Sequence, residues 1–263
     1  TSHTAIMARA LEVPAVVGLR EITRTARDGD SVIIDGGEGV VVVRPDAATL
    51  ARYREKRTSL AAAKRQMALL KRLPARTRDG RTLRVEANIE LPAEVETVKK
   101  YGAAGIGLYR TEYLFLNRRD VPGEEEQFQA YRGVAREMKD RPVVVRTLDI
   151  GGDKFASAMD FPAEINPFLG CRAIRFCLER REIFETQLKA VLRAAAHGDL
   201  RLLLPMISTA DEMREALSII AAVKKKLRRE CCAFREDIPV GVMIEVPAAA
   251  VIADILAREA AFF

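Results

Sequence analysis

Two arginines and a glutamate stand where short apolar runs end. Arg110 follows GIGLY, Arg146 follows VVV and Glu245 follows VMI. Such runs are typical of buried parallel strands, whose carboxyl ends meet at one edge of a sheet. The guanidinium fork of arginine matches the oxygens of carboxylate and phosphate groups, so Arg110 and Arg146 are suited to bind one substrate that carries both.

Glu245 and the two arginines would be costly to bury unless each met an opposite charge. A carboxylate at this edge suits a hard cation, and Mg²⁺ bridging substrate oxygens is the cofactor that we expect. The spacing alone leaves a second interpretation open, in which these charges pair with one another in internal salt bridges.

Arg172 is a further candidate for anion binding. It stands in NPFLGCRAIR, residues 166–175, close to the start of an expected helix, where its positive charge opposes the helix dipole. A bound anion would relieve that conflict, and Arg175 lies one turn later. The Gly151-Gly152 pair earlier in the chain would let the backbone approach an anion closely.

His3 is the candidate nucleophile. It stands in the segment TSH before an expected helix over residues 4–11, whose free N–H groups would hold a phosphate placed on the imidazole. A neutral imidazole is a competent nucleophile near neutral pH. On local sequence alone, an ordinary exposed histidine is the simpler interpretation. His197, beside Gly198, is interpreted as a structural residue near a helix end.

The elements that would position these residues alternate between strands and helices from Leu83 onward. Apolar runs predict strands over 83–91, 105–110, 142–150, 200–207 and 239–246. Helical patterns cover 93–101, 124–138, 170–197, 211–230 and 248–258. This alternation predicts parallel βαβ units, and with a sixth strand starting at Phe262 it favours an α/β fold that is part of a (β/α)₈ TIM-type barrel. An open doubly wound sheet is the alternative, although no GxGxxG follows a strand.

The first part of the chain has a different pattern, with predicted strands at 14–18, 32–35 and 40–44 and a hairpin turn before the last of them. The stretch 47–73 contains no Gly or Pro and carries apolar side chains at spacings of 3 and 4, which predicts one long amphipathic helix. We therefore expect three parts: residues 1–45, a helical linker over 46–75, and the barrel over 76–263.

Composition argues against several classes of protein. The 263 residues carry a formal net charge of +6, but the basic run Lys224–Arg229 has no interleaved aromatic residues to stack bases, so we expect no nucleic-acid partner. No apolar run reaches the roughly 20 residues of a membrane span. The four cysteines form no CxxC pair, which indicates reduced thiols in a cytoplasmic protein.

Five longer segments resemble, in order and spacing, enzyme I of the bacterial phosphoenolpyruvate-dependent sugar phosphotransferase system. They are TSHTAIMARALEVPAVVG, GIGLYRTEYLF, VVVRTLDIGGDK, NPFLGCRAIR and GVMIEVPAAA, and together they extend the resemblance over essentially the whole chain. The resemblance implies a phosphotransferase that moves the phosphoryl group of phosphoenolpyruvate to a histidine of a swivelling domain. The group then passes to the carrier protein HPr during sugar uptake, and pyruvate is released.

The matched segments also imply roles for single residues. His3 would be the phosphohistidine, Glu245 a ligand of Mg²⁺, and three arginines would hold phosphoenolpyruvate, namely Arg110, Arg146 and Arg172. Asp149 and Lys154 match residues near the site. Residues 1–45 would be the C-terminal part of the swivelling phosphohistidine domain, and the barrel would form a homodimer in the full-length protein.

The chain stops before the segment that supplies a second acidic metal ligand in this family, so we do not expect it to run the full reaction alone. Two groups of relatives are alternatives. One is the nitrogen-related paralogue of enzyme I, and the other comprises pyruvate phosphate dikinase and phosphoenolpyruvate synthase, which share the histidine domain and the barrel.

Overall fold

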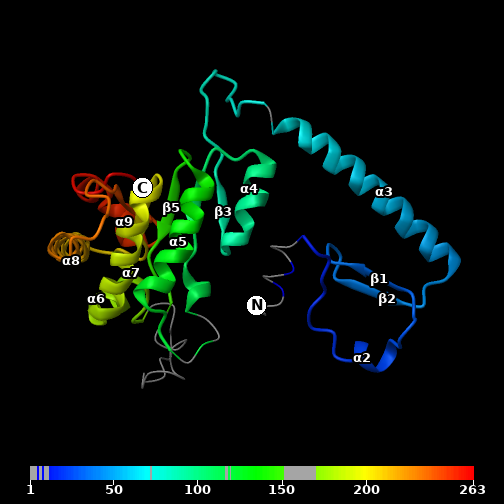
Figure 1. Ribbon diagram of the computed structural model, residues 1–263. Helices are drawn as coiled ribbons and strands as arrows, with labels where there is room; N and C mark the ends of the chain where they lie inside the picture. The colour runs from blue at the N-terminus through cyan, green and yellow to red at the C-terminus, as the bar shows by residue number, and fades with distance from the viewer. Residues whose placement is uncertain are drawn as a thin grey trace. The chain divides into compact units, whose positions relative to one another are not determined.

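The computed structural model describes residues 5, 8, 12–71, 73–115, 118, 120–150 and 170–263. The chain forms two compact units, Thr1–Leu83 and Arg84–Phe263 (Figure 1). Figure 1 draws the hairpin and the long helix of the first unit in blue and cyan, and the sheet and helices of the second in green to red.

A β-hairpin is the first regular feature of the smaller unit. β1 (Val32–Asp35) and β2 (Val40–Val43) pair antiparallel. In the turn between them, Asp35 Oδ1 accepts hydrogen bonds from Gly37 N at 3.0 Å and from Glu38 N at 3.1 Å. The hairpin expected from the glycine-rich turn is therefore confirmed.

α3 (Ala47–Leu70) is the long helix that the absence of Gly and Pro predicts. Asp46 caps its first turn by accepting a hydrogen bond from Thr49 N at 2.7 Å. Lys56 then joins the helix to the two carboxylates of the hairpin turn, each at 2.5 Å. The helix is thus fixed to the hairpin near its first turns.

None of the described residues of this unit is buried. Leu60, Met67 and Leu70 of α3 are exposed over 57%, 66% and 62% of their surface, so the apolar stripe expected along the helix is not covered. The strand expected at 14–18 is wrong. That stretch is irregular and pairs with none of the described strands, and α2 (Ile22–Thr25) is the short helix that follows it. The helix expected over 4–11 lies mostly outside the described residues.

The larger unit is built on a parallel sheet with its strands in sequence order. The strands are β3 (Ala87–Ile89), β4 (Ile106–Tyr109), β5 (Val143–Arg146), β6 (Leu200–Leu204) and β7 (Val240–Val242). Beyond β7, Ala261 N donates to Val240 O at 2.8 Å and Val242 N donates to Phe262 O at 3.1 Å. The backbone that follows therefore begins to continue the sheet, as the sequence predicts for Phe262.

Helices alternate with these strands. They are α4 (Val95–Tyr101), α5 (Glu124–Met138), α6 (Ala173–Glu179), α7 (Arg181–Ala194), α8 (Ala210–Arg229), α9 (Pro247–Val251) and α10 (Ala253–Leu256), with 3₁₀ turns η1 (Pro92–Glu94), η2 (Glu112–Leu114) and η4 (Ala195–His197). The single helix expected over 170–197 is in fact two. It is interrupted at Arg180, whose backbone leaves the helical region at φ −109° and ψ 67°.

The core shows how the helices lie on the sheet. Val143 and Val145 belong to the main core with residues of α4, α5, α7 and α8, whereas Val144, between them, belongs to a small cluster with Leu108 and Leu203 of the neighbouring strands. In the described part of the unit, the main core therefore lies on one face of the sheet. A doubly wound sheet would carry helices on both faces, so the arrangement is that of part of a barrel.

We expect Gly198→Ala to destabilise the larger unit. The added carbon would lie 2.7 Å from the backbone oxygen of Ala135 in α5, so the helix and the start of β6 would have to move apart. Overpacking of this kind typically costs about 1–3 kcal/mol. Urea unfolding of this chain would measure the change, and an unaltered midpoint would contradict it.

Gly133→Ala in α5 is the matched control. Its added carbon meets nothing within 4 Å. Because alanine favours a helix over glycine by about 1 kcal/mol, this variant should be as stable as the wild type or slightly more stable.

Candidate functional site

The candidate site lies at the carboxyl ends of the parallel strands. β4 ends at Tyr109 and β5 ends at Arg146, so Arg110, Arg146 and the residues after them emerge at the same edge of the sheet. This is the edge at which enzymes of the (β/α)₈ class carry their active sites. The charged side chains along this edge are therefore the candidates for binding and catalysis.

Arg146 is the most buried charge at this edge, with 8% of its surface exposed. It donates from one terminal nitrogen to Glu112 Oε1 at 2.8 Å, and its other terminal nitrogen pairs with Asp149 Oδ2 at 3.0 Å. Its Nε is buried and has no hydrogen-bond partner among the described residues. Within the described part of the chain, the guanidinium is thus neutralised at its two terminal nitrogens, while its Nε has no acceptor.

Asp149 joins two of the candidate arginines. Its Oδ2 pairs with Arg146, and its Oδ1 accepts from Arg172 at 2.8 Å and 3.2 Å. Arg172 immediately precedes α6. In the sequence it follows the segment 151–169, which lies outside the described residues. The structure therefore brings Arg146 and Arg172 together around one carboxylate.

Glu112 is the second carboxylate of this cluster. Besides Arg146, its Oε1 accepts a hydrogen bond from Asp149 N at 3.2 Å. Burial raises the pKa of the Glu112 carboxyl and outweighs the lowering effect of the Arg146 guanidinium. Sequence reasoning missed this residue, although it stands two positions after Arg110 in the segment YRTE.

Arg110 pairs with a different carboxylate. It donates to Glu90 Oε1 at 2.7 Å, and both side chains are partly exposed. Glu90 follows β3 directly, so this pair lies at the same edge of the sheet, one strand away from Arg146. In this structure all three candidate arginines make internal salt bridges, the second interpretation that the spacing left open.

Glu245 lies three residues after the end of β7 and is exposed. Its Oε1 accepts a hydrogen bond from Met206 N at 2.8 Å. The expectation of a buried carboxylate at a strand end is therefore wrong, because β7 is short and the chain has left the sheet before it reaches this residue. Because Glu245 is exposed, its charge needs no metal to offset a cost of burial.

A hard carboxylate oxygen still suits Mg²⁺, and Glu245 has a second oxygen beyond the one that Met206 N contacts. No group of three or more His, Cys, Asp or Glu side chains gathers for a metal among the described residues. These residues therefore fit one ligand of a magnesium site and leave the other ligands to water, substrate or further chain.

Other candidates lie elsewhere or outside the described residues. His3, Lys154 and the Gly151-Gly152 pair are among the residues that the structure does not describe. Arg175 donates to Ser208 Oγ at 3.3 Å and stands 3.8 Å from a Glu212 oxygen. His197 is exposed and lies beside the ring of Phe128, with 6.0 Å between the ring centres, and desolvation together with the charges of Arg136 and Arg132 lowers its pKa.

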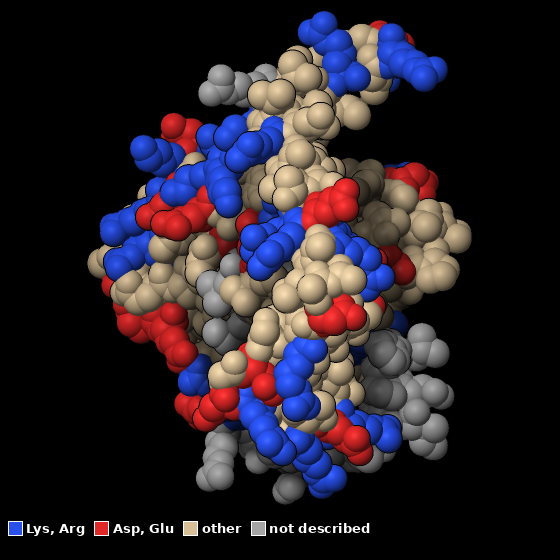
Figure 2. All heavy atoms as spheres, turned by 90° about the vertical axis from the view of Figure 1, so that its right-hand side faces the viewer, with Lys and Arg blue, Asp and Glu red and all other residues tan. Residues whose placement is uncertain are grey.

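The charged surface and the apolar character of the helices bear on possible nucleic-acid and membrane contacts. Figure 2 shows one face of the molecule, on which basic and acidic side chains are interspersed. Within the basic run of α8, Arg228 pairs with Glu236, and Lys226 lies 3.7 Å from Glu185. Among the described residues, no helix is long and apolar enough to cross a membrane.

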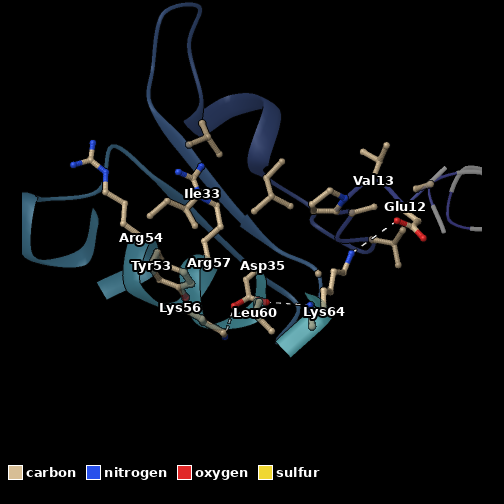
Figure 3. A pocket seen from close by; sticks show the side chains of 18 of the residues that line it. Glu12, Val13, Ile33, Asp35, Tyr53, Arg54, Lys56, Arg57, Leu60 and Lys64 are labelled. Carbon is tan, nitrogen blue, oxygen red and sulfur yellow. Dashed lines mark hydrogen bonds and ion pairs between the residues drawn. The ribbon is translucent and has the colours of Figure 1, made fainter. Parts of the chain in front are cut away.

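The smaller unit carries a hollow of about 1050 Å³ between the hairpin, α3 and the preceding irregular segment (Figure 3). Its lining includes Ile33, Tyr53 and Leu60, together with the ion pair of Lys56 and Asp35 drawn in Figure 3. None of the described candidate residues lines it. The hollow and the site at the sheet edge therefore share no described residue.

Comparison with known proteins agrees with this geometry. The sequence profile of the PEP-binding domain of PEP-utilising enzymes matches residues 64–263, and that of their mobile domain matches residues 1–39. The chain belongs to the family of PEP-utilising enzymes. Its α/β fold with a parallel sheet is the one expected for this family from the sequence.

Several relatives share the same protein name. The chain is 49% identical over its whole length to "Phosphoenolpyruvate-protein phosphotransferase" of Geobacillus stearothermophilus, 48% identical to that of Bacillus subtilis (strain 168), and 47% identical to that of Staphylococcus aureus (strain MRSA252). In each case the match covers 46% of the relative. The chain thus spans about half the length of the curated relatives that it matches.

We expect the contribution of Glu112 to the free energy of unfolding to fall as the pH rises above about 4.5, and Glu112→Gln to remove that contribution. Burial raises the pKa of Glu112 above its ordinary value of 4.5, so the unfolded chain releases this proton at a lower pH than the folded chain. Between the two pKa values the folded state binds more protons and loses stability with rising pH. Urea unfolding of both proteins between about pH 4 and pH 7 would measure the difference.

Glu125→Gln is the control of opposite sign. Gln129 and Arg193 lower the pKa of Glu125, so its contribution to stability is lost as the pH falls. If the stability difference between the wild type and Glu112→Gln stayed constant or grew with pH, the interpretation of Glu112 would be wrong.

Proposed function

We propose that this chain is part of a phosphoenolpyruvate-protein phosphotransferase, which takes the phosphoryl group of phosphoenolpyruvate onto His3 and passes it to the carrier protein HPr. The observation that carries the proposal is the pair of arginines held around Asp149 at the carboxyl edge of the sheet. The names of the relatives, at 46–49% identity over the full chain, support the same function.

The arginine cluster suits an anion that carries a phosphate and a carboxylate. Arg146 and Arg172 are already neutralised by Asp149 and Glu112, so a substrate oxygen that replaces one carboxylate exchanges one ion pair for another. This exchange avoids leaving a buried guanidinium unpaired, which would be costly. Arg146 Nε, unsatisfied among the described residues, is a further donor for a substrate oxygen.

In the proposed reaction, an imidazole nitrogen of His3 forms a bond to phosphorus while the bond from phosphorus to the enolate oxygen breaks. The enolate then takes a proton and leaves as pyruvate. The arginines position the phosphate and spread its charge, which is most of what phosphoryl transfer asks of a protein. In this reading Arg110, Arg146 and Arg172 are the substrate-binding residues.

Mg²⁺ would be held in part by Glu245 and would neutralise charge that develops on the substrate oxygens. We further propose that residues 1–45 end the swivelling phosphohistidine domain, that 46–75 is the linker, and that 76–263 is part of the phosphoenolpyruvate-binding barrel. A homodimer through that barrel belongs to the same proposal. The four free cysteines fit a reducing compartment, and we propose the cytoplasm.

The function is tested with a protein of the relatives' full length that contains this chain. Incubated with phosphoenolpyruvate labelled in its phosphoryl group and with Mg²⁺, it should gain one acid-labile label, because phosphohistidine hydrolyses in acid. His3→Ala should abolish the label, and removal of Mg²⁺ with a chelator should prevent it. Full labelling of His3→Ala would exclude His3 as the acceptor, and an unlabelled wild type would exclude the function.

Arg146→Lys should lower kcat/KM for phosphoenolpyruvate at least about tenfold in the same protein, which is about 1.4 kcal/mol. Lysine keeps the charge, but its single ammonium cannot contact Glu112, Asp149 and a substrate oxygen with the geometry of the planar fork. The change in initial rate with substrate concentration would measure this loss.

Arg235→Lys is the matched control for that substitution. Arg235 also makes ion pairs, with Asp199 at 3.0 Å and Asp237 at 3.1 Å, but it lies by the amino-terminal end of β6, away from the candidate site. We expect its kcat/KM to stay near that of the wild type. An equal loss in both variants would mean that Arg146 has no special role in the reaction.

A further inference from the structure

Four polar side chains lie completely inside the larger unit, behind the arginine cluster. Thr111, Gln127 and Tyr131 have no exposed surface, and Gln187 is 1% exposed. Buried polar groups are costly unless they are hydrogen-bonded, so their bonds should account for their presence. Together these four residues form a buried polar network.

Gln187 is the centre of this network. From α7, its side-chain oxygen accepts a hydrogen bond from Leu148 N at 2.9 Å. Its side-chain nitrogen donates to Thr111 Oγ1 at 3.1 Å and to Tyr131 Oη at 3.2 Å. Both hydrogens of the amide nitrogen are therefore used, and its oxygen has a partner.

Thr111 continues the chain of bonds to the strand. Having accepted from Gln187, its hydroxyl donates to the backbone oxygen of Arg146 at 3.0 Å. At the other end, Tyr131 donates to Gln127 Oε1 at 3.1 Å, and Gln127 donates to Pro122 O at 3.0 Å. Gln187 Nε2 donates two hydrogen bonds, and each other side-chain donor described here has one acceptor, so the hydrogen bonds of the network are mutually consistent.

The location of these bonds decides their consequence. β5 ends at Arg146, and the bond from Thr147 N to Leu203 O at 3.0 Å is the last that the neighbouring strand makes with this stretch. The side-chain oxygen of Gln187 then accepts from the next backbone donor, the buried Leu148 N, while the Thr111 hydroxyl donates to the Arg146 oxygen. Side chains therefore hold the Arg146 oxygen and the Leu148 nitrogen, on either side of the Thr147 nitrogen that β6 holds.

Arg146 and Asp149 leave the backbone on either side of this held stretch, and they contact each other at 3.0 Å. We propose that Gln187, acting with Thr111, is a positioning residue that sets where the Arg146 guanidinium meets the phosphoenolpyruvate anion. This inference rests on the proposed function. Among the described residues, the Gln187 side chain makes no hydrogen bond to a charged side chain of the cluster, so we expect it to act through the backbone that carries Arg146.

A purely structural role makes a different prediction from a positioning role. If Gln187 only filled the core, replacing it should change KM no more than replacing any other buried glutamine of the unit. If it positions Arg146, its loss should weaken substrate binding in the ground state and the transition state alike, so KM should rise while kcat changes little. The two roles are separated by comparing two glutamines of equal burial.

The experiment uses the full-length protein that contains this chain and two matched variants. Gln187→Met keeps the length of the side chain but makes none of its three hydrogen bonds. Gln127→Met is the control, because the side-chain hydrogen bonds given for Gln127 are to Pro122 and Tyr131 and not to β5 or the residues after it. For Gln187→Met we expect KM for phosphoenolpyruvate to rise at least about fivefold with kcat within about twofold of the wild type. For Gln127→Met we expect a similar loss of stability and an unchanged KM.

Thr111 offers a test by a conservative variant. Thr111→Ser keeps the hydroxyl that bonds the Arg146 oxygen and should keep KM within about twofold of the wild type, whereas Thr111→Val keeps the shape and should raise KM as Gln187→Met does. Because both residues act on one stretch of backbone, the double variant Gln187→Met with Thr111→Val should be less than additive. A fully additive double variant would overturn the shared role.

A second measurement does not depend on activity. Amide hydrogen exchange at Leu148 should become at least about tenfold faster in Gln187→Met and should stay near the wild-type rate in Gln127→Met. A KM that moves no more in Gln187→Met than in Gln127→Met would overturn the proposal. If the wild-type protein took no label from phosphoenolpyruvate, the proposed function would fail. Unchanged amide exchange at Leu148 in Gln187→Met would separately overturn the positioning role.

Discussion

The guanidinium of Arg146 is almost fully buried at the end of a parallel strand, and a charge in that position requires carboxylates around it. Glu112 and Asp149 meet this requirement from the ends of two adjacent strands, β4 and β5. Asp149 in turn holds Arg172, which arrives from beyond the segment 151–169. One buried cation thus determines which acidic and basic groups gather at this edge of the sheet.

The fold makes such a cluster possible because its strands are parallel and follow in sequence order. Each strand delivers the residue after its last pair to the same edge, so side chains far apart in the chain meet there. The main core lies on one face of the sheet in the described part of the unit, with the small cluster around Val144 on the other. The helices then supply buried partners from behind, of which Gln187 is the clearest.

The smaller unit is organised differently. Its described residues form a hairpin and a long helix joined by the bonds of Lys56, and none of them is buried. The described contacts of this unit are the hairpin hydrogen bonds, the helix cap at Asp46 and the ion pairs, and its described residues bury little apolar surface. The larger unit, with its continuous core, is stabilised mainly by burial of apolar surface.

The sequence by itself determined the alternation of strands and helices, the hairpin and the length of α3, because consecutive apolar residues, glycine turns and the absence of Gly and Pro act locally. It also pointed to Arg110, Arg146 and Arg172 as a family's anion-binding residues. Only the tertiary structure decided which carboxylate meets which arginine, that Glu245 is exposed, and that Gln187 bonds to Leu148 N, two residues after Arg146. These facts depend on contacts such as that between Thr111 and Gln187, which are 76 residues apart, and local patterns carry no information about them.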